Sequence, residues 1–185
     1  MAKMQIILVI VVLLFFVNAN AASDTTVQTK DANVLVKLNL LQGYSDGSLK
    51  LQNKINRSEF ITLVVRMMGY DKNTDTSDVN LKFKDITPKQ WAYNYIKIAV
   101  KRGVVAGYPD NTIAPNNYVT YSEALTVLIR VLGYQNNLTG KWPDNVINES
   151  TQLGLVKDLS VPQNKQLTRG EMSVLVYNSL TVNFK

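Results

Sequence analysis

The chain of 185 residues contains 20 Lys and Arg against 14 Asp and Glu, which gives a formal net charge of +6, and it contains neither His nor Cys. Without imidazole and thiol groups, a Ser-His-Asp triad, a Cys nucleophile, a His/Cys zinc site and a disulfide are all excluded. Hydrophobic residues make up 46% of the chain and charged residues 18%. This balance is typical of a folded protein rather than a disordered one.

The first 21 residues have the features of a secretory signal peptide. Lys3 supplies a positive charge, an unbroken apolar run of 12 residues follows over residues 6–17, and residues 19–21 read Ala-Asn-Ala. Signal peptidases cleave after such a small-x-small pattern. The alternative, a membrane anchor, needs about 20 apolar residues in a row. We therefore predict a signal peptide over residues 1–21 and a secreted domain over residues 22–185, with no membrane span after cleavage.

The basic residues are scattered along the chain rather than gathered. Their longest run is the pair Lys101-Arg102, and no stripe of basic and aromatic residues accompanies it. A groove that tracks nucleic-acid phosphates needs such a stripe, so we expect no nucleic-acid partner. For an exported protein, a modest positive charge is better suited to an anionic polymer of the cell wall.

An internal repeat with a period of 64 residues is the strongest pattern in the sequence. Residues 43–70 and 107–134 are identical at 10 of 28 positions, and most of the others exchange one apolar residue for another. A third, shorter copy follows, in which residues 168–171 correspond to residues 120–123. Repeats in series indicate units that cannot each bury an apolar face alone and must share one core.

Each copy reads as a helix, a loop and a second helix. In the second copy, apolar residues share one helical face over residues 91–102, and Gly103 is placed to stop that helix. Turn formers and helix breakers follow over residues 107–115. The second helix of each copy starts at a capping box, and the three boxes are Asn56-x-x-Glu59, Thr120-x-x-Glu123 and Thr168-x-x-Glu171. Because these helices are apolar nearly all round, we predict that the three pack against one another in the core.

The ordered residues of the three copies resemble S-layer homology repeats. In the second copy they are Phe83-x-Asp85, Trp91-Ala92, Gly107-Tyr108-x-Asp110 and Thr120-x-x-Glu123. The first copy has Gly43-Tyr44-x-Asp46-Gly47, and the third has Leu167-Thr168-Arg169-Gly170-Glu171. The resemblance covers essentially the whole chain after the leader, with repeats at about residues 28–72, 82–135 and 142–181.

The resemblance implies a mainly α fold, with three helix-loop-helix repeats in a pseudo-threefold arrangement around a central three-helix bundle. It also implies noncovalent attachment to a bacterial cell wall, through an anionic, pyruvylated secondary polysaccharide that binds in grooves between repeats. In this family the Arg of a Thr-Arg-Ala-Glu motif faces the acidic sugar, helped by a Trp and by the Gly/Asp loop. The residues of this chain that match those positions are Arg57, Arg169, Trp91, Asp46, Gly47 and Asp110.

Arg57 and Arg169 occupy the first helical position after the cap. A cation there opposes the positive end of the helix dipole at a cost of about 0.3–1 kcal/mol, so helix stability does not explain it. Beside free amides of the first helical turn, a guanidinium would make a carboxylate receptor. The alternative is a solvated surface Arg. The second copy has Tyr121 at this position, which cannot neutralise an anion but could stack on a sugar ring or hydrogen-bond to it.

Several other residues of the repeats have a structural interpretation. The repeated Glu residues are expected to cap helices rather than to act as catalytic acids. Arg66 and Arg130 suit the negative ends of their helices, and we interpret them as structural. Trp91 is expected either to face a sugar or to belong to the core. Asp46 and Asp110 are turn residues first of all.

We therefore predict a noncatalytic wall-binding domain that uses no cofactor and no metal. The alternative is a degenerate repeat domain that acts as a structural or protein-interaction module, with other surface-layer proteins as partners. Its motivation is that each copy lacks one piece: the first has no Trp, the second no Arg, and the third no Gly-Tyr-x-Asp loop. A glycan hydrolase would need two carboxylates flanking a cleft, and the repeated Glu residues already serve as caps.

Overall fold

The computed structural model describes residues 25–185, and this part of the chain consists of helices joined by long loops. Extended pairing is limited there to isolated bridges, so the predicted mainly α class is confirmed. The signal peptide predicted over residues 1–21 lies outside the described residues. After a leading helix over residues 25–37, the elements are α2 (Arg57–Met67), α3 (Tyr93–Lys101), α4 (Tyr121–Leu132), the short 3-10 helix η1 (Gln135–Asn137), α5 (Asp144–Gln152) and α6 (Arg169–Ser179).

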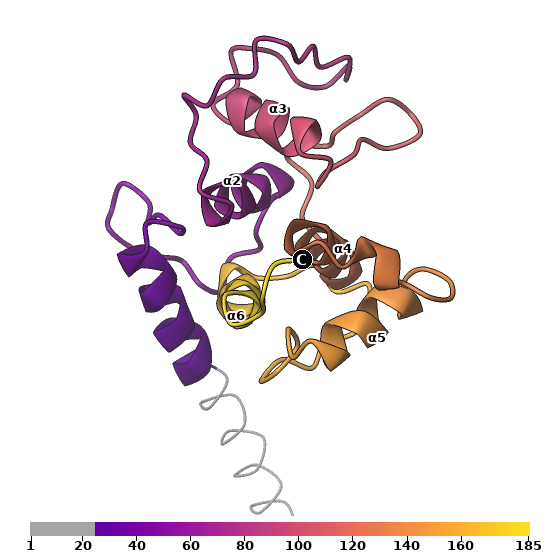
Figure 1. The fold of residues 1–185 in the computed structure, drawn as a ribbon. Helices are drawn as coiled ribbons and strands as arrows, with labels where there is room; N and C mark the ends of the chain where they lie inside the picture. The colour runs from indigo at the N-terminus through magenta and orange to yellow at the C-terminus, as the bar shows by residue number, and fades with distance from the viewer. Residues whose placement is uncertain (1–24) are drawn as a thin grey trace, which may run out of the picture.

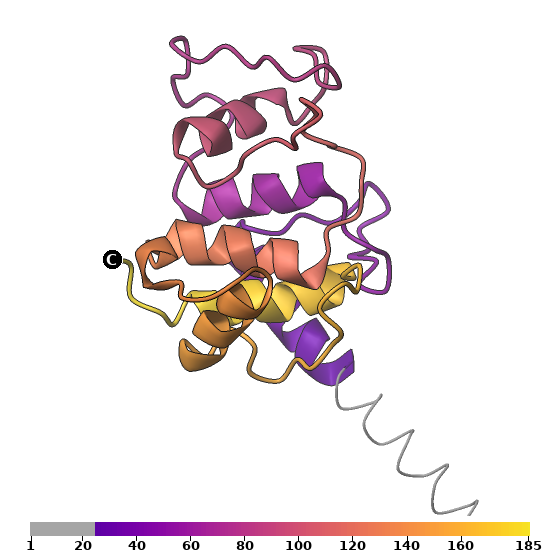
Figure 2. The ribbon, with the colours of Figure 1, turned by 90° about the vertical axis from the view of Figure 1, so that its right-hand side faces the viewer.

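Three central helices, α2, α4 and α6, lie side by side, and the leading helix, α3 and α5 lie outside them (Figure 1, Figure 2). Each outer helix packs on the central helix of the preceding repeat, since α3 contacts α2 and α5 contacts α4. The leading helix closes the series on α6, where a Cβ added to Gly170 would stand 2.3 Å from Oε1 of Gln28. Neighbouring repeats therefore interlock, and the first helix of the described chain touches the last.

A closed ring of three backbone hydrogen bonds joins the segments that precede the central helices. The amide of Ile55 donates to the carbonyl of Leu167 at 3.0 Å, the amide of Leu167 to the carbonyl of Val119 at 2.9 Å, and the amide of Val119 to the carbonyl of Ile55 at 3.1 Å. All three residues are at most 1% exposed. An unpaired buried amide is costly, so this ring fixes the three repeats relative to one another. It supports the pseudo-threefold arrangement, which stays a prediction.

The three predicted capping boxes are confirmed. In α2, Oδ1 of Asn56 accepts the Glu59 amide at 2.9 Å, and the Glu59 carboxylate accepts the Asn56 amide at 3.0 Å. The same reciprocal pair forms at Thr120 with Glu123 and at Thr168 with Glu171. Each cap uses one carboxylate oxygen of its Glu, which leaves the other oxygen for contacts outside the helix.

The remaining first-turn amides of the central helices are also occupied, which corrects one step of the sequence argument. The amides of Arg57 and Ser58 donate at 2.9 Å to the carbonyls of Asn117 and Pro115, in the loop of the second repeat. The corresponding pairs are Tyr121 with Lys165, Ser122 with Gln163, Arg169 with Asn53, and Gly170 with Leu51. The expected carboxylate receptor, built from free helix amides beside an Arg, is therefore wrong for the described helices.

The caps predict a measurable contribution to stability. Thr120→Ala removes the oxygen that accepts the Glu123 amide and the hydroxyl that donates to the Glu123 carboxylate at 2.8 Å. We expect the free energy of unfolding to fall by about 1 kcal/mol, measured by urea denaturation followed by circular dichroism. Thr151→Ala is the control, because Thr151 is exposed on α5 and bonds only to the carbonyl one turn earlier. Equal losses in the two variants would show that the cap contributes nothing.

Candidate functional site

Two cavities between repeats are built from corresponding residues. The first, which we call the Arg169 groove, has a volume of about 150 Å³, and its lining includes Arg169, Tyr44, Glu59, Thr62, Arg66 and Trp91. The second, the Arg57 groove, has a volume of about 220 Å³, and its lining includes Arg57, Tyr108, Glu123, Thr126, Arg130 and Trp142. Each groove takes its Arg from one predicted repeat, its Tyr and Glu from the next, and its Trp from the third.

Arg57 projects from the first position of α2 into the loop of the second repeat. Its Nε donates to the carbonyl of Ile113 at 2.9 Å and its Nη2 to the carbonyl of Ala106 at 3.1 Å. The guanidinium carbon lies 5.0 Å from the ring centre of Tyr108. Arg57 is 7% exposed, so it is not the solvated surface residue of the alternative interpretation. Two carbonyls and an aromatic face hold this planar cation in one orientation.

Arg169 makes the corresponding contacts with the loop of the first repeat. Its Nε and Nη2 donate at 2.8 Å to the carbonyls of Leu49 and Gln42, and its guanidinium carbon lies 4.8 Å from the ring centre of Tyr44. It is 4% exposed. One contact is added, because Nη1 of Arg169 lies 3.3 Å from Oε1 of Glu59. The charge of this Arg is therefore partly neutralised inside the protein.

The Tyr of each Gly-Tyr-x-Asp loop binds the free oxygen of a capping Glu. Tyr44 donates to Glu59 at 3.1 Å, and Tyr108 donates to Glu123 at 2.6 Å. Burial, reinforced by this hydrogen bond, raises the pKa of Tyr108 to about 12. Burial opposes the ionisation of Glu123, but hydrogen bonds from Tyr108 and Thr120, with the charge of Arg57, hold its pKa below the usual value. At neutral pH the Arg57 groove thus contains an ionised carboxylate and a neutral phenol.

An exposed Trp completes each groove. Trp91 is 64% exposed and Trp142 is 59% exposed, so Trp91 does not belong to the core. The indole N–H of Trp142 donates to Oγ1 of Thr126 at 3.1 Å, which fixes the ring beside the Arg57 groove. At the corresponding Thr62, the buried hydroxyl oxygen has no hydrogen-bond partner within residues 25–185. An open indole face beside a fixed cation suits a ligand that has both an apolar ring face and a negative charge.

Tyr121, predicted to contact a sugar, is 5% exposed and lines neither groove. Its burial raises the pKa of its phenol. A ring enclosed in this way cannot offer a face to a ligand, so the predicted stacking role of Tyr121 is corrected. The residue fills part of the core at the start of α4 instead.

The acidic loop residues close their own turns. Oδ1 of Asp46 accepts both the amide and the hydroxyl of Ser48, and a salt bridge joins Asp46 to Lys50 at 3.1 Å. These hydrogen bonds lower the pKa of Asp46 to about 2. Asp110 accepts the same pair of bonds from Thr112. Gly47 has φ +79°, as the turn requires. None of these residues lines the two grooves, and a role for them in ligand binding stays a prediction.

The third junction between repeats has a different chemistry. Lys165 forms a salt bridge with Glu171, the third capping Glu. Val27 stands where the 64-residue offset from Trp91 falls. A cavity of about 510 Å³ lies here, and Val27, Lys165 and Glu171 are among the residues that line it. Neither an Arg nor a Trp belongs to this lining.

Sequence reasoning missed Trp142 and treated Arg130 as a helix end only. The repeat itself carried a signal for both residues. Trp142 follows Trp91 by 51 residues, the spacing that also relates α5 to α3, and Arg130 follows Arg66 by 64 residues. Within residues 25–185, no cluster of acidic side chains could hold a metal ion, and no helix is long and apolar enough to cross a membrane.

Comparison with known proteins identifies the family. The model of the S-layer homology domain matches residues 29–61 and 82–125, within the first two predicted repeats. The middle cell wall protein of Brevibacillus brevis is 32% identical over 171 residues, which cover 89% of this chain and 16% of that protein. The surface layer protein of Brevibacillus choshinensis is 34% identical over 155 residues, 80% of this chain and 14% of that protein. The cellulosome-anchoring protein of Acetivibrio thermocellus is 26% identical over 156 residues, 76% of this chain and 35% of that protein.

The fold and the two grooves define a helical repeat module that presents fixed cations between its repeats. The chain is an S-layer homology domain protein, secreted and located at the bacterial cell surface. It spans about a third or less of the length of the three relatives named above. The matched segments leave the third predicted repeat uncovered, so the extent of the three repeats stays a prediction.

The Tyr108 environment predicts how stability changes at alkaline pH. Its pKa in the folded state, about 12, lies above the ordinary value of 10.0. The neutral buried phenol therefore contributes stability that is fully present below about pH 10 and is lost as the pH approaches 12. Urea unfolding between pH 8 and pH 11.5 should show a smaller loss of stability for Tyr108→Phe than for the unchanged protein. Tyr118→Phe is the control, because Tyr118 is 48% exposed. Identical pH profiles for all three proteins would contradict this expectation.

Proposed function

We propose that the protein binds an acidic, pyruvylated cell-wall polysaccharide noncovalently in the Arg57 and Arg169 grooves and is anchored to the wall in this way. One observation carries the proposal: each groove combines a buried, oriented guanidinium with an exposed indole. The names of the relatives, which include cell wall, surface layer and anchoring proteins, agree with this role.

The two side chains match the two parts of such a ligand. A pyruvate ketal adds a carboxylate to a sugar ring, and Nη1 of Arg57 makes no hydrogen bond to any residue of the described chain. A hydrogen bond between charged partners contributes about 1.5–3 kcal/mol, and its strength increases where water is largely excluded. The exposed Trp142 can then cover the apolar face of the same ring. Two grooves on one long polymer would add an effective concentration to the weak single contacts.

The proposed role is noncatalytic and requires no cofactor. Glu59 is the one carboxylate among the side chains that line the Arg169 groove, and Glu123 is the one in the Arg57 groove. Both are engaged by a helix cap and by a Tyr hydroxyl. Hydrolysis of a glycoside by an acid and a base requires two carboxylates on either side of the scissile bond. The grooves described therefore favour binding over hydrolysis.

Sedimentation with wall sacculi tests the proposal. The mature protein should sediment with sacculi that carry a pyruvylated polymer and should remain in the supernatant after acid has stripped that polymer. Equal sedimentation with stripped sacculi would overturn polymer binding. If the folded protein then captured a purified surface-layer protein, the alternative role as a protein-interaction module would replace it.

The Trp residues provide the sharper variant. Trp91→Ala combined with Trp142→Ala should reduce the sedimented fraction strongly, at least tenfold in apparent affinity, because each exposed indole contributes a ligand contact in its groove. Since both side chains are mostly exposed, the fold should be retained, which circular dichroism can verify. Phe184→Ala is the matched control, because Phe184 is 60% exposed and lines neither groove. Loss of sedimentation in the control alone would exclude the grooves as the binding site.

A further inference from the structure

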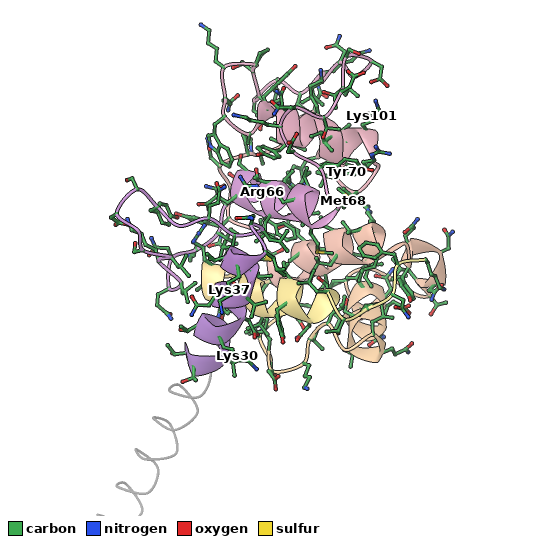
Figure 3. All side chains as sticks on the ribbon, turned by 60° about the vertical axis from the view of Figure 1, so that its left-hand side comes forward. Lys30, Lys37, Arg66, Met68, Tyr70 and Lys101 are labelled. Carbon is green, nitrogen blue, oxygen red and sulfur yellow. The ribbon has the colours of Figure 1, made fainter. Side chains whose placement is uncertain are left out.

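Arg66 and Arg130 occupy corresponding positions on α2 and α4, yet their surroundings differ. Nη2 of Arg66 donates to Oε1 of Gln42 at 3.1 Å and to the Tyr95 hydroxyl at 3.4 Å. Figure 3 shows Arg66 on α2, between α3 and the leading helix. Arg130 is half-buried and lines the Arg57 groove, but its guanidinium forms neither a hydrogen bond nor an ion pair with any residue from 25 to 185.

The sequence explains why Arg130 lacks these partners. The 64-residue offset that relates Arg66 to Arg130 places Ala106 where the first repeat has Gln42. The 51-residue offset that relates α5 to α3 places Val146 where α3 has Tyr95. A methyl group and an isopropyl group thus replace an amide and a hydroxyl, and neither can accept a hydrogen bond. Both internal partners of this cation are absent from the second groove as a direct result of side-chain identity.

The first cation of each groove shows the same contrast. Arg169 pairs with Glu59 at 3.3 Å, whereas no carboxylate within the described chain lies within 4 Å of the guanidinium nitrogens of Arg57. The Arg57 groove therefore offers two guanidiniums that have unshared donors. In the Arg169 groove both guanidiniums are engaged by the protein. A ligand carboxylate would compete there with Glu59 and Gln42.

We infer that the Arg57 groove is the principal carboxylate site, and that Arg130 is the residue that makes it so by adding a second cation contact to that of Arg57. The inference rests on the proposed function and assigns its acidic sugar to one groove. Two cations suit the two oxygens of one carboxylate, and a half-buried guanidinium without a partner is stabilised when an anion binds to it. The larger volume, about 220 Å³ against 150 Å³, leaves room for the substituent that carries the charge.

The chain contains two Trp residues, one at each groove, so fluorescence can read the grooves separately. In Trp91→Phe the remaining Trp142 reports on the Arg57 groove, and in Trp142→Phe the remaining Trp91 reports on the Arg169 groove. The probe is a methyl mannoside that carries a 4,6-pyruvate ketal. We expect the Trp142 signal to saturate at about tenfold lower probe concentration than the Trp91 signal, the ratio that one charged hydrogen bond produces.

Three variants in the Trp91→Phe background identify the cause. Arg130→Gln should raise the dissociation constant at the Arg57 groove about tenfold, and Arg66→Gln should change it less than threefold. Ala106→Gln installs the amide that occupies Arg66 in the other groove, and it should weaken binding as Arg130→Gln does. Circular dichroism verifies the fold of each variant. Equal affinity at the two grooves, or an Arg130→Gln variant that binds like its parent, would overturn the inference and leave the proposed function intact.

Two further probes separate the two claims. Neutral methyl mannoside should bind at least tenfold more weakly than the ketal, and equal binding would overturn the carboxylate assignment. Methyl glucuronide carries its carboxylate directly on the ring. A response of Trp142 to the glucuronide alone would support the Arg130 site and overturn the pyruvate part of the proposed function. Binding of none of these sugars by either groove would overturn both.

Discussion

The structure depends on how the start of each central helix is held by a neighbouring repeat. The buried ring of Ile55, Val119 and Leu167 joins the three helix starts, and loop carbonyls occupy the first-turn amides beside it. The same crossing carries the side chain of Arg57 or Arg169 into the next loop. The contacts that assemble the domain are therefore also the contacts that build the grooves, and a single repeat would contain neither.

Local features could be read from the sequence, whereas contacts between distant backbone groups could not. The capping box of Thr120 and Glu123 lies within four residues, so side-chain identity alone predicts it, and the same holds for the other two boxes. The amide of Arg169 is bound by the carbonyl of Asn53, more than a hundred residues away. A backbone carbonyl has no signature in the sequence. The expectation of free amides failed for this reason, although the helix start itself was predicted correctly.

Much of the site followed from the repeat, and the errors have definable causes. Correspondence between copies placed Arg57, Arg169 and Trp91 at groove positions, and the same offsets would have added Arg130 and Trp142. Tyr121 was misjudged because a position in a repeat does not determine exposure. At the third junction the leading helix contributes Val27 rather than a Trp. The packing partner of a side chain, which comes from another repeat, decided each of these outcomes.

The capping Glu residues form a graded series across the three junctions. Glu171 is paired with Lys165, and Glu59 is paired with Arg169 and receives a Tyr hydroxyl. Glu123 receives a Tyr hydroxyl, and no cation of the described chain lies within 4 Å of it. A buried charge is stable only when an opposite charge or hydrogen bonds compensate for its lost hydration. At two junctions the protein supplies that charge itself, which favours stability. At the Arg57 groove it leaves both Arg57 and Arg130 to be compensated from outside, and this is the condition under which an anionic ligand gains most from binding.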